Sequence, residues 1–218
     1  MTTTLSTTVL DVQDLRFAYP GEPPLVDRWT TAIAPGLTLL FGDTGSGKTT
    51  LLNVIAGTRP AAGGRLTLAG ARLDADPAAY RRALFWCDPA TEAFNDVTAR
   101  ACTAALSAGD ERFDPVAWQS LADGFALAPH LDKPMYMLST GSKRKVYLAA
   151  ALASGRALTL LDEPTGALDA ASIGHLMRRL AVLASQPERA IIVASYDRPA
   201  ALAFARVIEL PIGADQGA

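Results

Sequence analysis

The chain has 218 residues, of which 50% are hydrophobic and 19% charged, with a formal net charge of −2. This length is enough to bury a substantial core without staples, as one domain or as one domain with an inserted lobe. A charge near zero, with no basic stripe interleaved with aromatic residues, argues against a nucleic acid partner.

The chain carries no marks of export or of membrane insertion. Residues 1–8 have neither a positive n-region nor an apolar h-region, so we expect no signal peptide and a short frayed tail. The longest wholly apolar run, 146–153, is far shorter than the roughly 20 residues that cross a bilayer. If a membrane is involved, a partner must supply the span. Cys87 and Cys102 lack metal-ligand spacing, which favours reduced thiols in a cytoplasmic protein.

The first part of the chain has the alternating pattern of β-strands. The pattern occurs at 9–17, 29–33 and 65–68, with glycine and proline between the runs. We expect a small antiparallel β region here.

A further strand-like run, 37–41, leads directly into the sequence GDTGSGKT at 42–49, which fits the phosphate-loop pattern G-x-x-x-x-G-K-[ST]. Glycines let successive backbone N–H groups point at one cluster of phosphate oxygens, Lys48 adds a cation, and Thr49 offers a hydroxyl to Mg²⁺. The helix that begins here, which Gly57 should end, directs its positive dipole end at the anion. We therefore predict a site for a nucleoside triphosphate, since a chance match is expected in roughly one chain in a hundred. The predicted ligand-binding residues are Gly42, Asp43, Thr44, Gly45, Ser46, Gly47, Lys48, Thr49 and Thr50.

Between about residues 88 and 154 the pattern is helical, with apolar residues at three- and four-residue spacing. The predicted helices lie at 93–106, 115–127 and 141–152. Asp114 followed by Pro115 is a good helix start, because a capping side chain precedes proline at the first helical position. Two short basic groups, at 81–82 and 143–145, we interpret as solvated helix faces.

The run Leu-Ser-Thr-Gly-Ser at 138–142 opens the last of these helices. Ser139 can cap the helix, and the free N–H groups at its start could bind a phosphate. Taken alone, the run is an ordinary helix entry. Its place after the phosphate loop and before an acidic strand end makes it informative.

Two short apolar runs, 157–161 and 190–194, have the pattern of buried parallel strands, with a helical segment at 170–183 between them. The first run ends in Asp162 and Glu163. Ligands of open α/β folds bind at the carboxyl ends of such strands, so we expect Asp162 to serve Mg²⁺ and Glu163 to polarise an attacking water. An acidic strand end arises by accident in many chains, but rarely in one that also has a phosphate loop.

With these three motifs in this order, the chain resembles the ATPase subunits of ATP-binding cassette (ABC) transporters over nearly its full length. The resemblance implies an α/β fold: a P-loop NTPase (RecA-like) core with an N-terminal antiparallel β region and an inserted α-helical subdomain. It implies one ABC ATP-binding domain over 1–218, with the core at about 1–87 and 155–218 and the helical subdomain at about 88–154.

In that family two cassettes pair head to tail, and each ATP lies between the phosphate loop of one and the LSGGQ signature of the other. The run 138–142 is similar to the signature but departs from it at Thr140 and Ser142. The resemblance implies that Ser139 and Gly141 contact the γ-phosphate across the interface.

Two more positions are similar to family motifs. The run 166–169 resembles the D-loop, whose aspartate, here Asp169, helps to couple the two sites. Tyr19 lies where the family keeps an aromatic residue that stacks on adenine, although plain strand packing is the alternative.

Two departures bear on the reaction rate. The family keeps a glutamine after the strand predicted at 83–87, and here Asp88 follows; its carboxylate can bind metal or water but adds negative charge beside the triphosphate. The family keeps a histidine where Tyr196 stands, and a phenol with a reference pKa of about 10 donates only a neutral hydrogen bond. We therefore predict that the cassette binds Mg-ATP and dimerises but hydrolyses ATP slowly. The predicted catalytic residues are Glu163, Lys48, Tyr196 and Asp88, and the predicted metal ligands are Thr49, Asp162 and Asp88.

The resemblance implies an energy-coupling subunit that pairs with a second cassette, as a homodimer or an unequal heterodimer, and works on a separate integral membrane permease. It would be cytoplasmic and peripheral, on the inner face of the cell membrane. The segment 88–110 is the expected permease contact, with packing inside the helical lobe as the alternative. A soluble or regulatory ABC ATPase and a small-molecule kinase with a phosphate loop remain as other functions.

Overall fold

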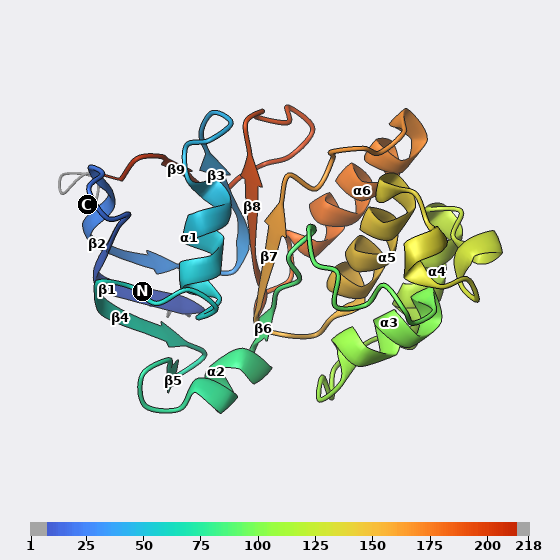
Figure 1. Cartoon of the computed structure of the whole chain (residues 1–218), viewed down its shortest axis with the longest axis horizontal. Helices are drawn as coiled ribbons and strands as arrows, with labels where there is room; N and C mark the ends of the chain where they lie inside the picture. Colours follow the sequence, from blue (N-terminus) through green and yellow to red (C-terminus); the bar gives the residue numbers. More distant parts are fainter. Residues whose placement is uncertain (1–7, 213–218) are drawn as a thin grey trace, which may run out of the picture.

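A five-stranded parallel sheet, in the order β6-β7-β8-β3-β9, forms the centre of the computed structural model, which describes residues 8–212 (Figure 1). All its pairings are parallel, so the carboxyl ends of its strands lie at one edge, the upper edge in Figure 1. Helices cover both faces, which explains why the predicted strands were continuous apolar runs. The strands are β3 (Gly36–Phe41), β6 (Leu84–Phe85), β7 (Leu158–Asp162), β8 (Ala190–Ser195) and β9 (Arg206–Glu209).

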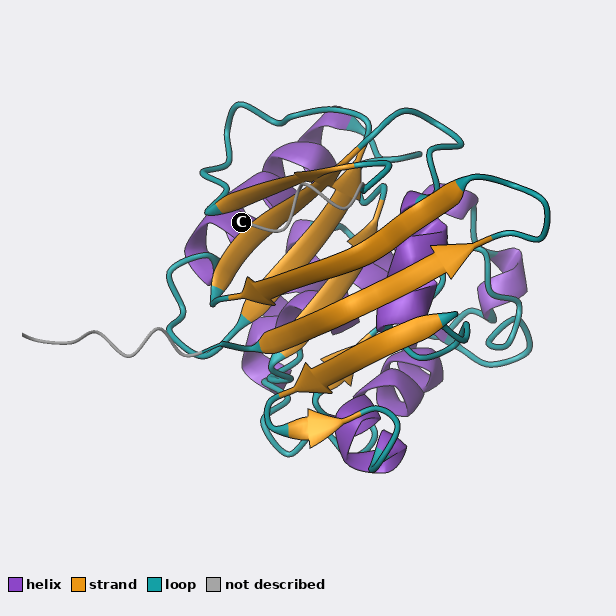
Figure 2. Cartoon of the chain, turned by 90° about the vertical axis from the view of Figure 1, so that its left-hand side faces the viewer, coloured by secondary structure: helices purple, strands orange, loops and turns teal. Residues whose placement is uncertain are grey.

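An antiparallel sheet in the order β2-β1-β4-β5 lies against this core and faces the viewer in Figure 2. The predicted antiparallel region is therefore confirmed. The strand expected at 29–33 begins earlier, at Pro24. Its first half was missed because Arg28 has a φ of 50° and the register between β1 and β2 shifts, so the alternation of apolar and polar residues is interrupted. The strands are β1 (Leu10–Ala18), β2 (Pro24–Ile33), β4 (Gly63–Leu68) and β5 (Ala71–Arg72).

The buried side chains form two clusters. The first joins the antiparallel sheet to α1 and one face of the parallel sheet. The second joins the other face to the helices on the right of Figure 1. The helices are α1 (Lys48–Ile55), α2 (Pro77–Arg82), α3 (Ala99–Ser107), α4 (Pro115–Gly124), α5 (Thr140–Ala153) and α6 (Ala170–Leu183), with 3-10 turns η1 (Ala128–His130) and η2 (Met135–Met137).

The helix boundaries follow their capping residues. The helix expected at 93–106 was wrong at its start, because Thr98 accepts a hydrogen bond from the N–H of Ala101 and α3 begins only at Ala99. The helix start predicted at Asp114 is confirmed, since its carboxylate accepts bonds from the N–H groups of Val116 and Ala117.

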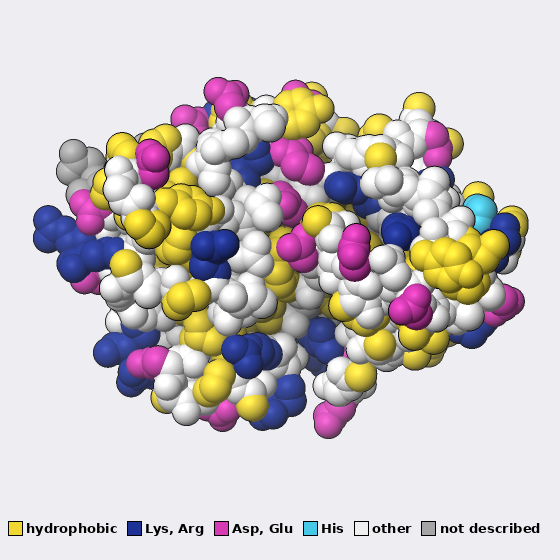
Figure 3. Space-filling view, in the orientation of Figure 1, with side chains coloured by type: hydrophobic (Ala, Val, Ile, Leu, Met, Phe, Trp, Pro, Cys, Tyr) yellow, Lys and Arg dark blue, Asp and Glu magenta, His cyan; other side chains and the backbone are white. Residues whose placement is uncertain are grey.

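The apolar run 146–153 is the buried second half of α5. Among residues 8–212, none of the helices combines the length and the apolarity that crossing a membrane requires. The tail expected at 1–8 lies outside the described residues except for Thr8. On the face drawn in Figure 3, acidic and basic side chains are interspersed, without a large block of either sign.

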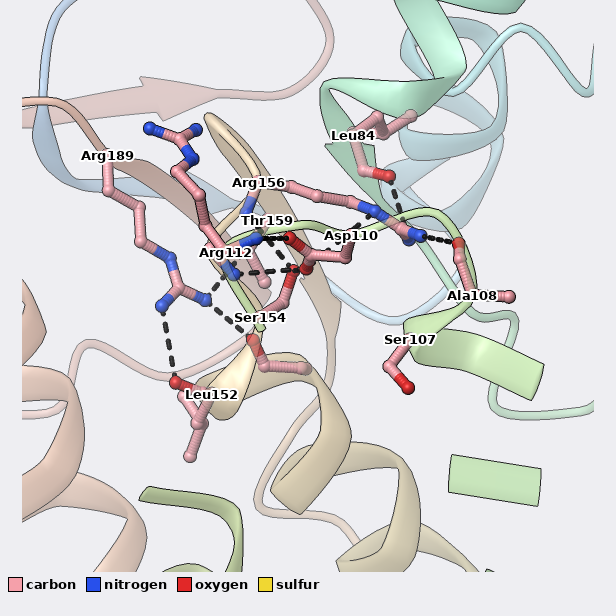
Figure 4. Close-up of polar contacts among 12 residues, drawn as sticks. Leu84, Ser107, Ala108, Asp110, Arg112, Leu152, Ser154, Arg156, Thr159 and Arg189 are labelled. Carbon is pink, nitrogen blue, oxygen red and sulfur yellow. Dashed lines mark hydrogen bonds and ion pairs between the residues drawn. The ribbon is translucent and has the colours of Figure 1, made fainter. Parts of the chain in front are cut away.

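A buried carboxylate joins the helices to the amino ends of the parallel strands (Figure 4). The side chain of Asp110 is 3% exposed; its Oδ2 accepts a 2.6 Å bond from Ser154 Oγ and lies 3.9 Å from Nε of Arg156. The guanidinium of Arg156 in turn donates to the carbonyl oxygens of Ala108, which ends α3, and Leu84, which begins β6. Three separate segments thus share one ionic cluster.

A second buried arginine lies beside this cluster (Figure 4). Arg189 donates to the carbonyl oxygens of Ala151 and Leu152 at the end of α5, and to Thr159 of β7. Burial lowers the pKa of Arg189 to about 10. This side chain therefore adds donors at the end of α5, where the helix itself supplies few for its last carbonyl groups.

We expect the substitution Asp110→Ala to lower the free energy of unfolding by about 3 kcal/mol, because it leaves the Arg156 cation and the Ser154 hydroxyl without their buried acceptor. For a chain of this length, that corresponds to a fall in the melting temperature of about 10 °C, measurable by thermal unfolding. Asp132→Ala is the matched control, because Asp132 pairs with Arg100 in an exposed ion pair. Equal melting temperatures for the two variants would contradict the anchoring role of Asp110.

Candidate functional site

The loop at 42–47 joins β3 to α1 at the carboxyl edge of the parallel sheet. Gly47, which precedes α1, has a φ of 95°, and a Cβ there would lie 2.5 Å from Cδ1 of Leu25. Only glycine fits both the left-handed backbone and the contact with Leu25. The loop can therefore turn tightly and present the free N–H groups of α1 at the sheet edge.

One pocket of about 320 Å³ collects most of the predicted site residues from three separate segments. They come from the phosphate loop, from the end of β7 and from the turn after β8. The lining residues are Thr44, Gly45, Gly47, Lys48, Thr49, Thr50, Asp162, Glu163 and Tyr196.

Lys48 lies at the centre of this arrangement, with its side chain only 6% exposed. Its ammonium donates to the carbonyl oxygens of Gly42, at 2.6 Å, and Asp43, at 2.9 Å. It also lies 3.2 Å from Oε1 of Glu163. A cation held between the loop and the end of β7 is available to any anion that enters the loop.

Thr49 and Asp162 meet across the same pocket. The Thr49 hydroxyl donates a 2.6 Å bond to Oδ2 of Asp162. Burial raises the pKa of Asp162, Asp88 adds to this rise, and the Thr49 hydrogen bond and the Lys48 charge oppose it. Within the described residues, the buried oxygens Oδ1 of Asp162 and Oε2 of Glu163 have no hydrogen-bond partner. Unpartnered buried acceptors of this kind fit a bound cation or its water.

The donor set suits Mg²⁺, which takes hard oxygen ligands. The described part of the chain holds no group of three or more His, Cys, Asp or Glu residues that could bind a metal ion by itself. The hydroxyl of Thr49 and the carboxylate of Asp162 are oxygen donors that could form part of a shell completed by other ligands.

Tyr19 borders the pocket through Thr50. The two hydroxyl oxygens are 2.6 Å apart. The ring meets Phe17 edge to face, and the guanidinium of Arg59 lies 5.5 Å from its centroid. With 40% of Tyr19 exposed, the ring is both held in place and open to a planar ligand.

Asp88 lies outside the pocket lining. The strand predicted at 83–87 is short, because β6 ends at Phe85. The carboxylate of Asp88 accepts a 2.8 Å bond from the N–H of Ala90 in the following turn. Burial is the main cause of the raised pKa of Asp162, and the negative charge of Asp88 adds a smaller part.

The predicted signature residues also lie outside the pocket of their own chain. Ser139 caps α5 by accepting a 3.1 Å bond from the N–H of Ser142. Gly141 lies so close to the segment after β7 that a Cβ there would be 2.4 Å from the carbonyl oxygen of Ala167. The start of α5 is therefore packed against the segment that follows Glu163.

Asp169 caps α6 through the N–H of Ser172 and pairs with Lys145 at 2.6 Å. The hydrogen bond from Lys145, helped by those from Ser172, holds the pKa of Asp169 well below its usual range. This contact is a second link between α5 and the segment that follows β7.

The interpretation of 143–145 as a solvated basic face was wrong for Arg144. Its guanidinium donates to the carbonyl oxygens of Asp162 and Glu163, and Lys143 donates to Asn95 at 2.8 Å. Arg144 is the site residue that sequence reasoning missed. No local pattern could reveal it, because its partners are backbone carbonyl groups 18 and 19 residues away.

Many known proteins are similar to this chain in sequence or in fold. The family model described as "ABC transporter" matches residues 29–166. The chain is 37% identical over 183 residues to the cytochrome c biogenesis ATP-binding export protein CcmA of Pseudomonas aeruginosa, covering 78% of this chain and 90% of that protein. It is 33% identical over 195 residues to the taurine import ATP-binding protein TauB of Pseudomonas entomophila, covering 87% and 73%.

A longer relative is the pyoverdine export ATP-binding/permease protein PvdT of Pseudomonas entomophila, which is 32% identical over 225 residues and is matched over 96% of this chain but only 34% of its own length. Among solved structures, the ATP-binding subunit of an ABC transporter has a TM-score of 0.75 at 22% identity, covering 86% of this chain and 79% of that one. A putative ABC transporter ATP-binding protein from Pyrococcus furiosus has a TM-score of 0.74 at 21% identity, covering 92% and 96%. These two structures share the fold.

Proposed function

Because the chain belongs to the family of ABC transporter ATP-binding subunits and is an ATPase of that family, we propose that it drives a separate membrane permease as one of a pair of cassettes. The observation that carries this proposal is the division of the site. Lys48, Asp162 and Glu163 share one pocket, whereas Ser139 and Gly141 lie outside it. A second cassette that contributes its own α5 start would complete each pocket.

Within the pocket, the backbone N–H groups of 42–50 would bind the phosphates, with Lys48 as the mobile cation. Tyr19 would stack on the adenine. Thr49 and Asp162 would hold Mg²⁺, which when bound neutralises charge on the phosphate oxygens. Glu163 would orient water for in-line attack on the γ-phosphate.

Ser139 and Gly141 of the second cassette would then contact the γ-phosphate, and Asp169 would couple the two sites through its contact with Lys145. Asp88 adds negative charge near Asp162, and Tyr196 provides a neutral phenol in place of an imidazole. Both changes act against stabilisation of the transition state, so we expect slow rather than absent hydrolysis.

We further propose one ABC domain over 1–218, with residues 88–154 as an inserted helical subdomain between the two core segments, about 1–87 and 155–218. The helices α3 and α4 make their main helix contacts with α5, which supports this division. A cytoplasmic position on the inner face of the cell membrane, with 88–110 facing the permease, follows from the same proposal. The name of PvdT, which joins an ATP-binding part to a permease, supports this pairing.

Pairing can be tested by light scattering. We expect the Glu163→Gln variant to double its mass when MgATP is added, because ATP is then bound between two cassettes and not consumed. Ser139→Ala in that background should weaken pairing, and its melting temperature would show whether the loss of the α5 cap alone, at about 1 kcal/mol, explains the change. A protomer that stays single at saturating MgATP, also with any cassette encoded beside it, would contradict the proposal.

A further inference from the structure

Glu163 has an unusual backbone. Its φ is 41°, in the left-handed region that residues other than glycine rarely adopt. A residue keeps such a conformation only when its surroundings hold it there, and such residues cluster at active sites. Three contacts hold this one. The N–H of Glu163 donates to Ala194 at 2.9 Å, and its carbonyl oxygen accepts bonds from the N–H of Gly166 and the guanidinium of Arg144.

Arg144 reaches this turn from the second turn of α5, the helix that begins with the signature run. The same Nη1 atom also lies 3.3 Å from the carbonyl oxygen of Asp162. Gly166 leaves room for the guanidinium, since a Cβ there would lie 3.3 Å from Nη1. Burial lowers the pKa of Arg144, and the nearby charges of Asp162 and Glu163 oppose this effect.

From this geometry we propose that Arg144 is a positioning residue for Glu163. Its guanidinium holds the left-handed turn, and the turn aims the carboxylate into the pocket, where Oε1 lies 3.2 Å from Lys48. Arg144 does not line the pocket and therefore acts through Glu163. The inference rests on the proposed function, in which Glu163 orients the attacking water.

The contact between Arg144 and Glu163 also links the start of α5 to the proposed catalytic carboxylate of the same chain. Arg144 lies on α5, one turn beyond the residues proposed to meet the γ-phosphate of the partner's ATP. A shift of α5 on pairing would therefore be transmitted directly to the backbone of Glu163. Because misplacement of a reacting group by about 1 Å can cost roughly a hundredfold in rate, loss of this contact should be visible in the rate of hydrolysis.

We expect Arg144→Ala to lower kcat for ATP hydrolysis between about tenfold and a hundredfold, while the Kd for ATP changes by less than about twofold. Arg144→Lys should retain part of the rate, since it keeps one charged donor but loses the planar fork. Arg100→Ala is the matched control, because Arg100 lies on α3 in an exposed pair with Asp132. Melting temperatures of all three variants would separate unfolding from loss of positioning, and Arg144→Lys carries the test if the alanine variant does not fold.

The decisive comparison repeats Arg144→Ala in the Glu163→Gln background, with single-turnover hydrolysis of radiolabelled ATP followed over hours. If Arg144 acts through Glu163, the second substitution adds little further loss. An equal fractional loss in both backgrounds, or an unchanged kcat in the single variant, would overturn the inference while leaving the proposed function intact. If Glu163→Gln alone leaves kcat unchanged, the proposed role of Glu163 fails, and this inference fails with it.

Discussion

Replacing Glu163 with glutamine should lower the rate of ATP hydrolysis about a thousandfold, while the Kd for ATP, measured at a protein concentration too low for pairing, stays within about twofold. A positioned general base contributes roughly a hundredfold to ten-thousandfold to such a reaction, and an amide cannot accept the proton of the water. The side chain keeps its size and its place beside Lys48, so the phosphate loop should be undisturbed. Steady-state phosphate release and titration with a fluorescent ATP analogue measure the two quantities.

Glu209→Gln provides the control for this measurement. Glu209 lies on β9 in an exposed ion pair with Arg198, away from the pocket lining. We expect its hydrolysis rate to match that of the unmodified chain. A Glu163→Gln rate within tenfold of the unmodified one would mean that another group activates the water.

The second large effect is a gain. We expect Tyr196→His to raise the hydrolysis rate up to about a hundredfold, because it restores a donor that can carry charge where the transition state develops it. Tyr196 lines the pocket and is 54% exposed, so an imidazole fits without repacking. Phosphate release measured between pH 6 and pH 8 gives the rate.

The gain in rate of the Tyr196→His variant should depend on pH. Histidine has an ordinary pKa of about 6.5, so the imidazolium is present below that pH and lost as the pH rises through it. The ratio of the variant's rate to that of the unmodified chain should therefore be larger at pH 6 than at pH 8. Tyr196→Phe isolates the contribution of the phenol hydroxyl. A histidine variant no faster than the unmodified chain at any pH would remove Tyr196 as a cause of slow turnover.

Much of the architecture could be predicted from residue patterns. The phosphate loop, the buried strands β7 and β8 and the capped start of α4 depend on residues that are neighbours in the chain, so their spacing is informative. Predictions failed where the backbone departs from regular geometry and no nearby residue type indicates the departure. Because of the irregular backbone at Arg28, the first half of β2 was not predicted, and because Thr98 caps α3, that helix begins later than predicted.

The same distinction applies to the site. The roles of Glu163, Tyr19 and Ser139 stay predictions until the measurements above are made, although their identities were readable from motifs. By itself, the sequence determined which groups could bind phosphate and metal, because those motifs are contiguous and their chemistry is local.

Only the tertiary structure decided how these groups meet. In the folded chain, Leu25 packs against Gly47, and Asp110 pairs with Arg156 in a buried cluster. Arg144 donates a hydrogen bond to the backbone carbonyl oxygen of Glu163. Each of these contacts joins segments that are far apart in the chain, and the last ends on a backbone carbonyl group, which every residue possesses. Contacts of that kind leave no trace in residue order, since packing of the completed sheet and helices selects them.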